Sequence, residues 1–242
     1  MLAAKNTNEK VIQYLCDTFK DAIDINHINK NFETALMIAA KSNKNDKVLQ
    51  YLCNTFKDTI NIRRHGQRVF LLATQYLSVE TLQCLYALFK DTIDINTKGK
   101  NGDTALMLAA RYNTNEQVIQ YLYNTFKDTI DINLRDIHGN TVFMLAAQYN
   151  ENEKIIQNLC EIFKETIDIN KQNNSGNTAL MLAARYSKNV VKIQYLYDTF
   201  KDTIDINVQN YEGNTALMLA ACNNVNVNVI QYLCETFKDK ID

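Results

Sequence analysis

The sequence predicts an all-α fold: a helix-turn-helix solenoid of about seven stacked repeats, of which the first and last are incomplete. One phrase of about 37 residues recurs along nearly the whole chain. Within each copy the apolar residues follow the periodicity of helices. Because neither helix of a copy could bury its apolar side alone, neighbouring copies must stack on one another.

The copies follow one another without a linker, so we predict a single array over residues 1–242. Met1 aligns with Met107, inside a helix, and the last copy stops where another unit would begin. We therefore expect further repeats beyond the ends, or ends that stack on something else, including end-to-end self-association. The predicted repeats are residues 1–26 (partial), 27–62, 63–96, 97–133, 134–170, 171–207 and 208–242.

The first helix of a unit is predicted from its turn and its cap. Gly102 suits a tight turn that needs a positive φ, and Thr104 can accept a hydrogen bond from a free amide of the first helical turn. Residues 105–112 (ALMLAARY) are good helix formers with small side chains, which allows close approach of neighbouring units. The polar segment 113–115 then ends this helix.

A second helix is predicted from about Glu116 to near Thr129. Ile119, Leu122 and Phe126 fall on one side of it and form an apolar stripe. The following segment, residues 130–133 (IDIN), is too short for a sheet strand, so we predict an extended connector to the next unit.

The phrase GDTALMLAA at 102–110 resembles the ankyrin repeat signature, G-x-T-P-L-H-x-A-A. Variants of it stand at 139–147, 176–184 and 213–221, and a shorter copy stands at 34–40. The resemblance covers essentially the whole chain. It implies an ankyrin-type solenoid, and because such arrays generally bind other proteins, it also implies a non-catalytic interaction scaffold.

The sequence departs from the ankyrin pattern in three ways. Alanine or valine replaces the family's proline, and methionine replaces its histidine, which removes a hydrogen bond between turns. The unit is about 37 residues long rather than about 33, and we assign the excess to one more turn of the outer helix. The junction at 61–66 lacks about three residues, which predicts a shortened finger and a bend. The replacements are Ala35, Ala105, Val142, Ala179 and Ala216 for proline, and Met37, Met107, Met144, Met181 and Met218 for histidine.

Charge and hydropathy narrow the function classes. The formal net charge is −1, so no overall positive field favours nucleic acid. No segment has the roughly 20 apolar residues of a membrane helix, and no signal peptide is present at the N-terminus. We therefore expect a cytoplasmic protein, in the host cytoplasm if the source is a virus or an intracellular bacterium, with no membrane and no nucleic acid partner.

The six cysteines predict neither disulfides nor a metal site. Cys16, Cys53, Cys160 and Cys234 share one register of the repeat, and other copies carry tyrosine there (Tyr86, Tyr123 and Tyr197). A position that accepts both residue types indicates packing.

The resemblance places a protein partner at the turn tips and at the exposed ends of the inner helices. The tips differ between units while the helices barely change, which favours binding, although unselected loops also vary. The predicted partner-binding residues are Tyr76, Lys100, Asn101, Asp103, Arg111, Tyr112, Ile137, His138, Asn140, Gln148, Tyr149, Asn174, Ser175, Arg185, Tyr186, Tyr211 and Glu212.

Four tyrosines recur at one register: Tyr76, Tyr112, Tyr149 and Tyr186. Stacked units would place them in a row on the concave side, at the roughly 10 Å spacing of packed helices. Tyrosine and arginine often anchor interfaces, but these rings could equally close the gaps between units, and the sequence leaves both interpretations open. A second register (Tyr14, Tyr51, Tyr121, Tyr195 and Tyr232) is predicted to be core.

No catalytic motif, cofactor motif or metal motif stands in the sequence, so we predict no enzyme activity, no cofactor and no metal. His27, His65 and His138 are placed at turn tips, and a meeting of His65 with a buried Cys84 would be coincidental. Two alternatives to a binding scaffold remain: a structural spacer within a longer array, and the targeting module of a larger enzyme or adaptor.

Overall fold

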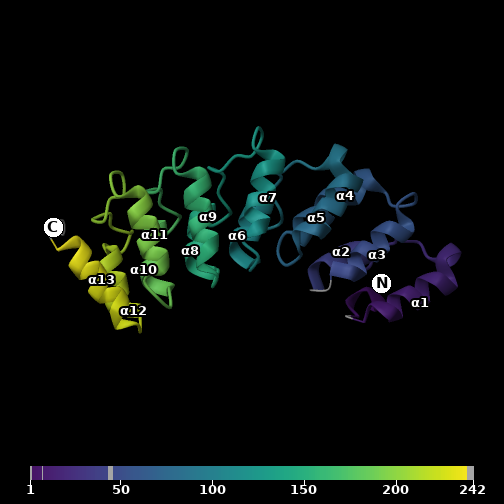
Figure 1. The fold of residues 1–242 in the computed structure, drawn as a ribbon, viewed down its shortest axis with the longest axis horizontal. Helices are drawn as coiled ribbons and strands as arrows, with labels where there is room; N and C mark the ends of the chain where they lie inside the picture. Colours follow the sequence, from purple (N-terminus) through teal and green to yellow (C-terminus); the bar gives the residue numbers. More distant parts are fainter. Residues whose placement is uncertain (1, 7, 43–45, 239–242) are drawn as a thin grey trace.

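The computed structural model describes residues 2–6, 8–42 and 46–238, and within these residues it is helical with no strand. The helices form two layers that run along a curved row, with the two termini at opposite ends (Figure 1). The inner helices are α2 (Ala35–Ser42), α4 (Ile62–Ala73), α6 (Ala105–Tyr112), α8 (Val142–Tyr149), α10 (Ala179–Tyr186) and α12 (Ala216–Asn223). The outer helices are α1 (Glu9–Phe19), α3 (Asp46–Phe56), α5 (Val79–Phe89), α7 (Gln117–Phe126), α9 (Glu153–Phe163), α11 (Val191–Phe200) and α13 (Val227–Phe237). Short 3₁₀ turns lie at η1 (Leu2–Lys5), η2 (Lys20–Ala22) and η3 (Lys90–Thr92).

The inner helices begin and end as the sequence predicts. Thr104 caps α6 by accepting from the amide of Met107, and Gly102 in the preceding turn has φ of 76°. The residues from Ala105 to Ala110 are all buried, because α6 is packed between α4 and α8 with α7 behind it. In α8 and α10 the methionine that replaces the family's histidine also serves the cap. There the sulfur atoms of Met144 and Met181 accept the amide of the capping threonine at 3.4 Å.

The outer helices carry the predicted apolar stripe but are shorter than predicted. In α7 the stripe of Val118, Ile119, Leu122 and Phe126 is buried. The helix ends at Phe126, not near Thr129, and the extra residues form a separate turn. In that turn the Phe126 carbonyl accepts from both the amide and the hydroxyl of Thr129, so the helix is closed without glycine.

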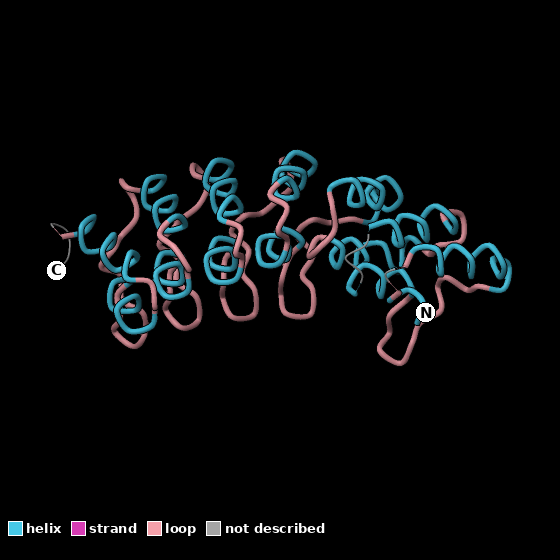
Figure 2. The backbone as a smooth tube through the Cα atoms, turned by 60° about the horizontal axis from the view of Figure 1, so that its bottom comes forward, coloured by secondary structure: helices cyan, strands magenta, loops and turns pink. Residues whose placement is uncertain are grey.

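A finger is the loop between the connector and the next inner helix. In every described finger except the one at 97–103, where Gly99 stands at the register, one side-chain oxygen accepts backbone amides of the loop. In the finger at 134–140, Asp136 Oδ1 accepts the amides of His138 and Asn140. Successive fingers are joined through their backbones, since Ile137 N donates to Asn101 O at 3.0 Å. Figure 2 shows four such loops hanging side by side and a fifth set apart near the N-terminal end. The four adjacent fingers are 97–103, 134–140, 171–177 and 208–214, and the separate one is 27–33.

The third unit has no finger, which corrects the prediction of a shortened one. Its residues instead extend the inner helix, so α4 has 12 residues where α6 has 8. Arg63 occupies the register of Asp136, and the segment is about three residues too short for the loop. His65 is therefore not at a turn tip. It is buried in α4 at 4% exposure, and burial lowers its pKa.

A chain of buried asparagines ties the ends of the inner helices together. Asn113 Nδ2 donates to the carbonyls of Thr74 and Leu77, both at 3.0 Å. Asn150 Nδ2 donates to Ala110 and Asn113 at 2.9 and 2.8 Å. Each asparagine thus satisfies carbonyls of the preceding unit, which would otherwise be buried without a partner. We call these residues, with Asn224, the asparagine ladder.

One step of the asparagine ladder is replaced. Ser187 stands where an asparagine is expected, and its hydroxyl is buried without a hydrogen-bond partner. Lys192 from α11 reaches the free carbonyl instead, with Nζ 3.1 Å from Ala147 O. In the two preceding units, the position equivalent to Lys192 is occupied by the buried apolar residues Val118 and Ile155. Burial lowers the pKa of Lys192 to about 8.

The shared cysteine and tyrosine register is a packing position, as predicted. Tyr123 packs edge-on against Phe163 of the next outer helix, with ring centroids 5.4 Å apart, and Cys160 is buried. Tyr86 and Tyr197 pack in the same way on the next phenylalanine. Cys234 differs because its side chain is exposed.

Candidate functional site

The four tyrosines at the ends of successive inner helices are here called the tyrosine row: Tyr76, Tyr112, Tyr149 and Tyr186. Each lies at or just beyond the C-terminal end of an inner helix, where the asparagine ladder fixes the backbone. Their exposed fractions are 38, 40, 44 and 45%, so each ring is half covered by its neighbours and half open to solvent.

Part of the tyrosine row is a contiguous stack. The rings of Tyr76 and Tyr112 have centroids 5.9 Å apart. The guanidinium carbon of Arg111 is 5.4 Å from the Tyr112 ring and 4.2 Å from the Tyr149 ring. Both distances are in the range in which the ring face attracts a cation. The stack therefore runs across three units, from the Tyr76 ring to the Tyr112 ring, the Arg111 guanidinium and the Tyr149 ring.

Arg111 is held in this stack from its other side by Asp103. A guanidinium nitrogen of Arg111 lies 3.5 Å from Asp103 Oδ1, and the two side chains are 13% and 6% exposed. Burial raises the pKa of Asp103, and the Arg111 charge opposes this shift. The Arg111 guanidinium therefore lies between the Asp103 carboxylate and the rings of Tyr112 and Tyr149.

The stack is interrupted between Tyr149 and Tyr186. Gln148 occupies the register of Arg111 there, and a cavity of about 220 Å³ opens between the two rings. We call it the Gln148 cavity. Its other lining residues are Asn150, Glu151, Glu153, Lys188, Asn189 and Lys192. Beyond it, Arg185 lies 5.2 Å from the Tyr186 ring.

The charged groups of the Gln148 cavity are partly engaged. Lys188 pairs with Glu151, and both side chains are largely exposed. Asn189 donates to Glu153, and this hydrogen bond lowers the pKa of the Glu153 carboxyl. Lys192 directs its ammonium to backbone carbonyls. The cavity is therefore lined by two carboxylates, two ammonium groups and two aromatic rings.

The fingers expose most of the predicted tip residues. Ile137 and Tyr211 are 58% and 75% exposed, and Lys100, Asn101, His138, Asn174, Ser175 and Glu212 are also exposed. Asp103 and Asn140 are different, since each is only 4% exposed. Asn140 accepts from Asn173 inside the finger layer. The Asn140 side chain thus joins two fingers, whereas the Asp103 side chain pairs with Arg111. Both side chains are buried, which corrects the prediction that they are exposed at the turn tips.

Two further sequence interpretations need correction. Cys84 is exposed and His65 is buried, which is the reverse of what was expected of this pair. Within the second tyrosine register, Tyr51, Tyr121, Tyr195 and Tyr232 pack against the core, whereas Tyr14 is 68% exposed.

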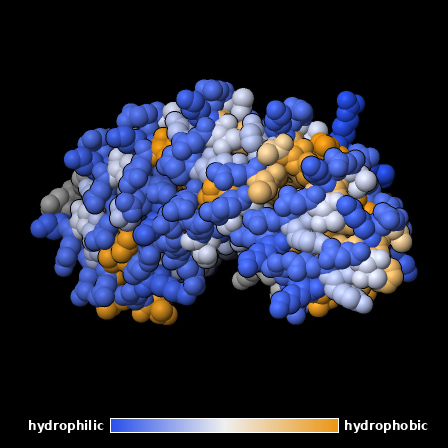
Figure 3. All heavy atoms as spheres, turned by 45° about the vertical axis from the view of Figure 1, so that its right-hand side comes forward, coloured by the Kyte–Doolittle hydropathy of each residue, from blue (hydrophilic) through white to orange (hydrophobic). Residues whose placement is uncertain are grey.

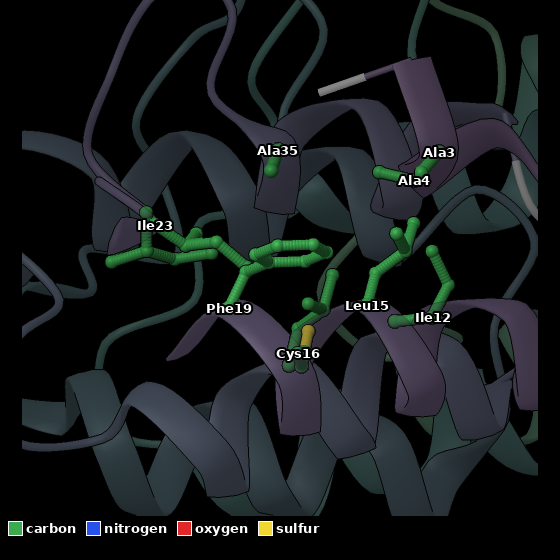
Figure 4. A pocket seen from close by; sticks show the side chains of 10 residues that line it. Ala3, Ala4, Ile12, Leu15, Cys16, Phe19, Ile23 and Ala35 are labelled. Carbon is green, nitrogen blue, oxygen red and sulfur yellow. The ribbon is translucent and has the colours of Figure 1, made fainter. Parts of the chain in front are cut away.

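Two further questions about the described part of the chain are whether it groups metal-ligating side chains and what lines the cavity at its N-terminal end. In the residues described, no group of three or more His, Cys, Asp and Glu side chains is arranged to hold a metal ion. A cavity of about 260 Å³ lies at the N-terminal end, where α1 side chains point towards Ala3, Ala4 and Ala35 (Figure 4). The side chains that line it are apolar, apart from the thiol of Cys16.

The comparison with protein families decides the identity of the fold. A model of ankyrin repeats matches in three copies, over residues 1–99, 70–173 and 143–242. The chain belongs to the ankyrin repeat family. Ankyrin repeats generally act as protein interaction modules. No curated protein matches the chain.

One face of the ankyrin array is mostly polar. Figure 3 shows a face on which hydrophilic residues predominate and apolar residues form small, separate groups. Of the helices described, none is long and apolar enough to cross a membrane. Sequence reasoning named Gln148, Tyr149 and Tyr186 but missed the cavity between them. The available signal was the change from arginine to glutamine at one register.

Proposed function

We propose that this ankyrin array is a non-catalytic scaffold that binds a protein partner along the tyrosine row and the adjoining finger tips. The stack of Tyr76, Tyr112, Arg111 and Tyr149 is the observation that carries the proposal. Tyrosine and arginine are the side chains that most often anchor interfaces. Because packing already fixes these groups, binding would lose little side-chain entropy.

A displayed library of random peptides provides an unbiased probe of this surface. The test compares the wild-type chain with the double variant Tyr112→Ala, Tyr149→Ala, using the peptides that the wild type selects. We expect Kd to rise about 30-fold or more, since losing two anchors removes about 2 kcal/mol or more. The melting temperature should change little, because half of each ring is open to solvent.

A matched control is Lys127→Ala with Lys201→Ala, which removes two exposed charges beyond the outer helices. This control should keep full affinity. The proposal fails if the double tyrosine variant binds the selected peptides as well as the wild type does. A large fall in melting temperature with no selected binder would instead assign the rings to packing and favour a structural spacer.

A second contact is proposed at the last helix pair, where one array would stack on another copy. Met218 is 51% exposed, whereas the equivalent Met107, Met144 and Met181 are at most 2% exposed. Val225 and Val227 are exposed nearby. Light scattering over a range of concentrations should show oligomers that Met218→Glu abolishes. A wild-type chain that stays monomeric throughout contradicts this contact.

A further inference from the structure

We propose that the Gln148 cavity binds an arginine side chain supplied by the protein partner. This inference rests on the proposed function, because it names the chemistry of one contact on the same surface. It goes further by assigning one guanidinium to one position between Tyr149 and Tyr186.

The array itself shows how such a position is filled. Between Tyr112 and Tyr149 the space is occupied by the guanidinium of Arg111, 5.4 and 4.2 Å from the two ring centroids. One unit further along, the same two tyrosine positions recur, but Gln148 replaces the arginine. The neutral amide does not fill the interval, and the cavity remains. An arginine from outside would restore the stack that the chain builds internally one unit earlier.

The size of the cavity favours one side chain. Its volume of about 220 Å³ lies below the roughly 300 Å³ at which pockets for small molecules begin. A cofactor or a drug-sized metabolite would not be enclosed. A single long side chain entering from the exposed surface would be.

Two carboxylates, beside the ammonium groups of Lys188 and Lys192, offer acceptors for the hydrogen bonds of a planar cation. Glu151 and Glu153 line the cavity. A hydrogen bond from Lys188 is the main cause that lowers the pKa of Glu151, and a hydrogen bond from Asn189 does the same for Glu153. The opposing charge of Lys192 lies at the backbone carbonyls of α8. Arginine stacks on rings and donates several hydrogen bonds at once, whereas a lysine ammonium is a more strongly hydrated point charge. Arginine is therefore the better match.

Titration with N-acetyl-arginine amide, followed by NMR of the ¹⁵N-labelled array, tests the assignment. We expect saturable shifts for Tyr149, Tyr186 and the start of α9, and none near Tyr76. N-acetyl-citrulline amide has nearly the same shape without the charge, and it should bind at least tenfold more weakly. N-acetyl-lysine amide should also bind more weakly.

The variant Gln148→Arg supplies the guanidinium from within the chain. It should abolish the shifts caused by N-acetyl-arginine amide while leaving the melting temperature unchanged or higher, which separates occupation of the cavity from misfolding. Equal binding of the citrulline or lysine amide overturns the proposal, as does undiminished binding to Gln148→Arg.

The two proposals can fail separately. If selected peptides lose affinity with the Tyr112→Ala, Tyr149→Ala variant but bind Gln148→Arg normally, the interaction surface stands and the arginine assignment fails. If arginine amide binds in the cavity but no peptide depends on the tyrosines, the cavity stands and the wider interface fails.

Discussion

The part of the array at residues 97–223 and the part at 27–96 are built from related units yet differ in regularity. The first part has four adjacent fingers, while the second has one finger and then the extended helix α4. In the first part Asn113 and Asn150 belong to the asparagine ladder, whereas buried Leu77 occupies the same register in the second. The comparison teaches that segment length decides whether a finger forms. The finger at 97–103 forms although Gly99 offers no side-chain acceptor at the register of Arg63, whereas the segment that carries Arg63 is about three residues shorter.

The largest expected effect comes from breaking the ladder in the regular part. Asn150→Ala removes both donors and leaves the carbonyls of Ala110 and Asn113 buried without partners. We expect a loss of about 3 kcal/mol in the free energy of unfolding, measured by urea denaturation. Asn54→Ala, at an exposed site on α3, should change it by less than about 0.5 kcal/mol. A loss under 1 kcal/mol for Asn150→Ala contradicts this view of the ladder.

The second prediction uses Lys192, the one departure within the regular ladder. Its pKa is about 8 when folded and 10.5 when unfolded, so between these pH values the unfolded chain holds more protons. Stability should therefore rise with pH from about 8 to 10.5, by at most about 3 kcal/mol.

The double variant Ser187→Asn, Lys192→Val restores the register of the other units and serves as the reference for Lys192. Tyrosines and cysteines titrate in the same range in both proteins, so the measured quantity is the difference between the two unfolding curves at each pH. The free energy of unfolding of the wild type, minus that of the double variant, should rise as the pH rises from about 8 to 10.5. A difference that is constant with pH would show that Lys192 keeps its ordinary pKa.

A third prediction exchanges turn residues between the two parts. Phe32 has φ of 59° in the isolated finger, where the regular fingers have glycine at φ of 76° to 82°. Phe32→Gly should raise stability by about 1 kcal/mol, since a bulky residue is strained in that conformation. Gly102→Ala should lower it by a similar amount or more, because the added carbon would lie 2.8 Å from Ile137 N. Thermal unfolding that gives both changes the same sign would refute this account.

The smallest effect is expected at Asp103, where the regular part begins. The two following fingers carry Asn140 and Asn177 at this register, and each accepts from the next finger. Asp103 instead lies near the like charge of Asp136. Burial is the largest cause that raises the pKa of Asp103, and the Asp136 charge raises it further. Asp103→Asn should raise stability at pH 7 by about 0.5 kcal/mol, because the lost pair with Arg111 offsets part of the gain. The gain should fall at pH 4, where the carboxyl becomes protonated, and an effect independent of pH would contradict this cause.

The sequence predicted the elements that depend on nearby residues. Gly102, Thr104 and the run from Ala105 to Tyr112 act within one turn of one another, so their turn, cap and helix were predictable. The helical structure of residues 62–68 was not predictable in this way, because Gly66 aligns with the finger glycines and suggested a turn. The shortened segment was visible in the sequence, but it suggested a shorter finger rather than a longer helix.

The sequence predicted which residues belong to the candidate site, but not how their side chains are arranged. The recurrence of Tyr112 and Tyr149 gave the row, but the position of the Arg111 guanidinium depends on Asp103 and on rings from two units. Burial of Asp103 and Asn140 also arises between fingers. Such contacts join residues about 37 positions apart, and repetition alone does not specify their geometry.

The asparagine ladder also bears on how an array of this kind can change its length in evolution. Asn150 satisfies a carbonyl of Asn113, which itself satisfies the unit before. A duplicated or excised whole unit therefore meets the same donors and acceptors at both of its boundaries. Recombination in steps of one unit preserves every buried hydrogen bond of the ladder, whereas a fractional insertion breaks the series at once.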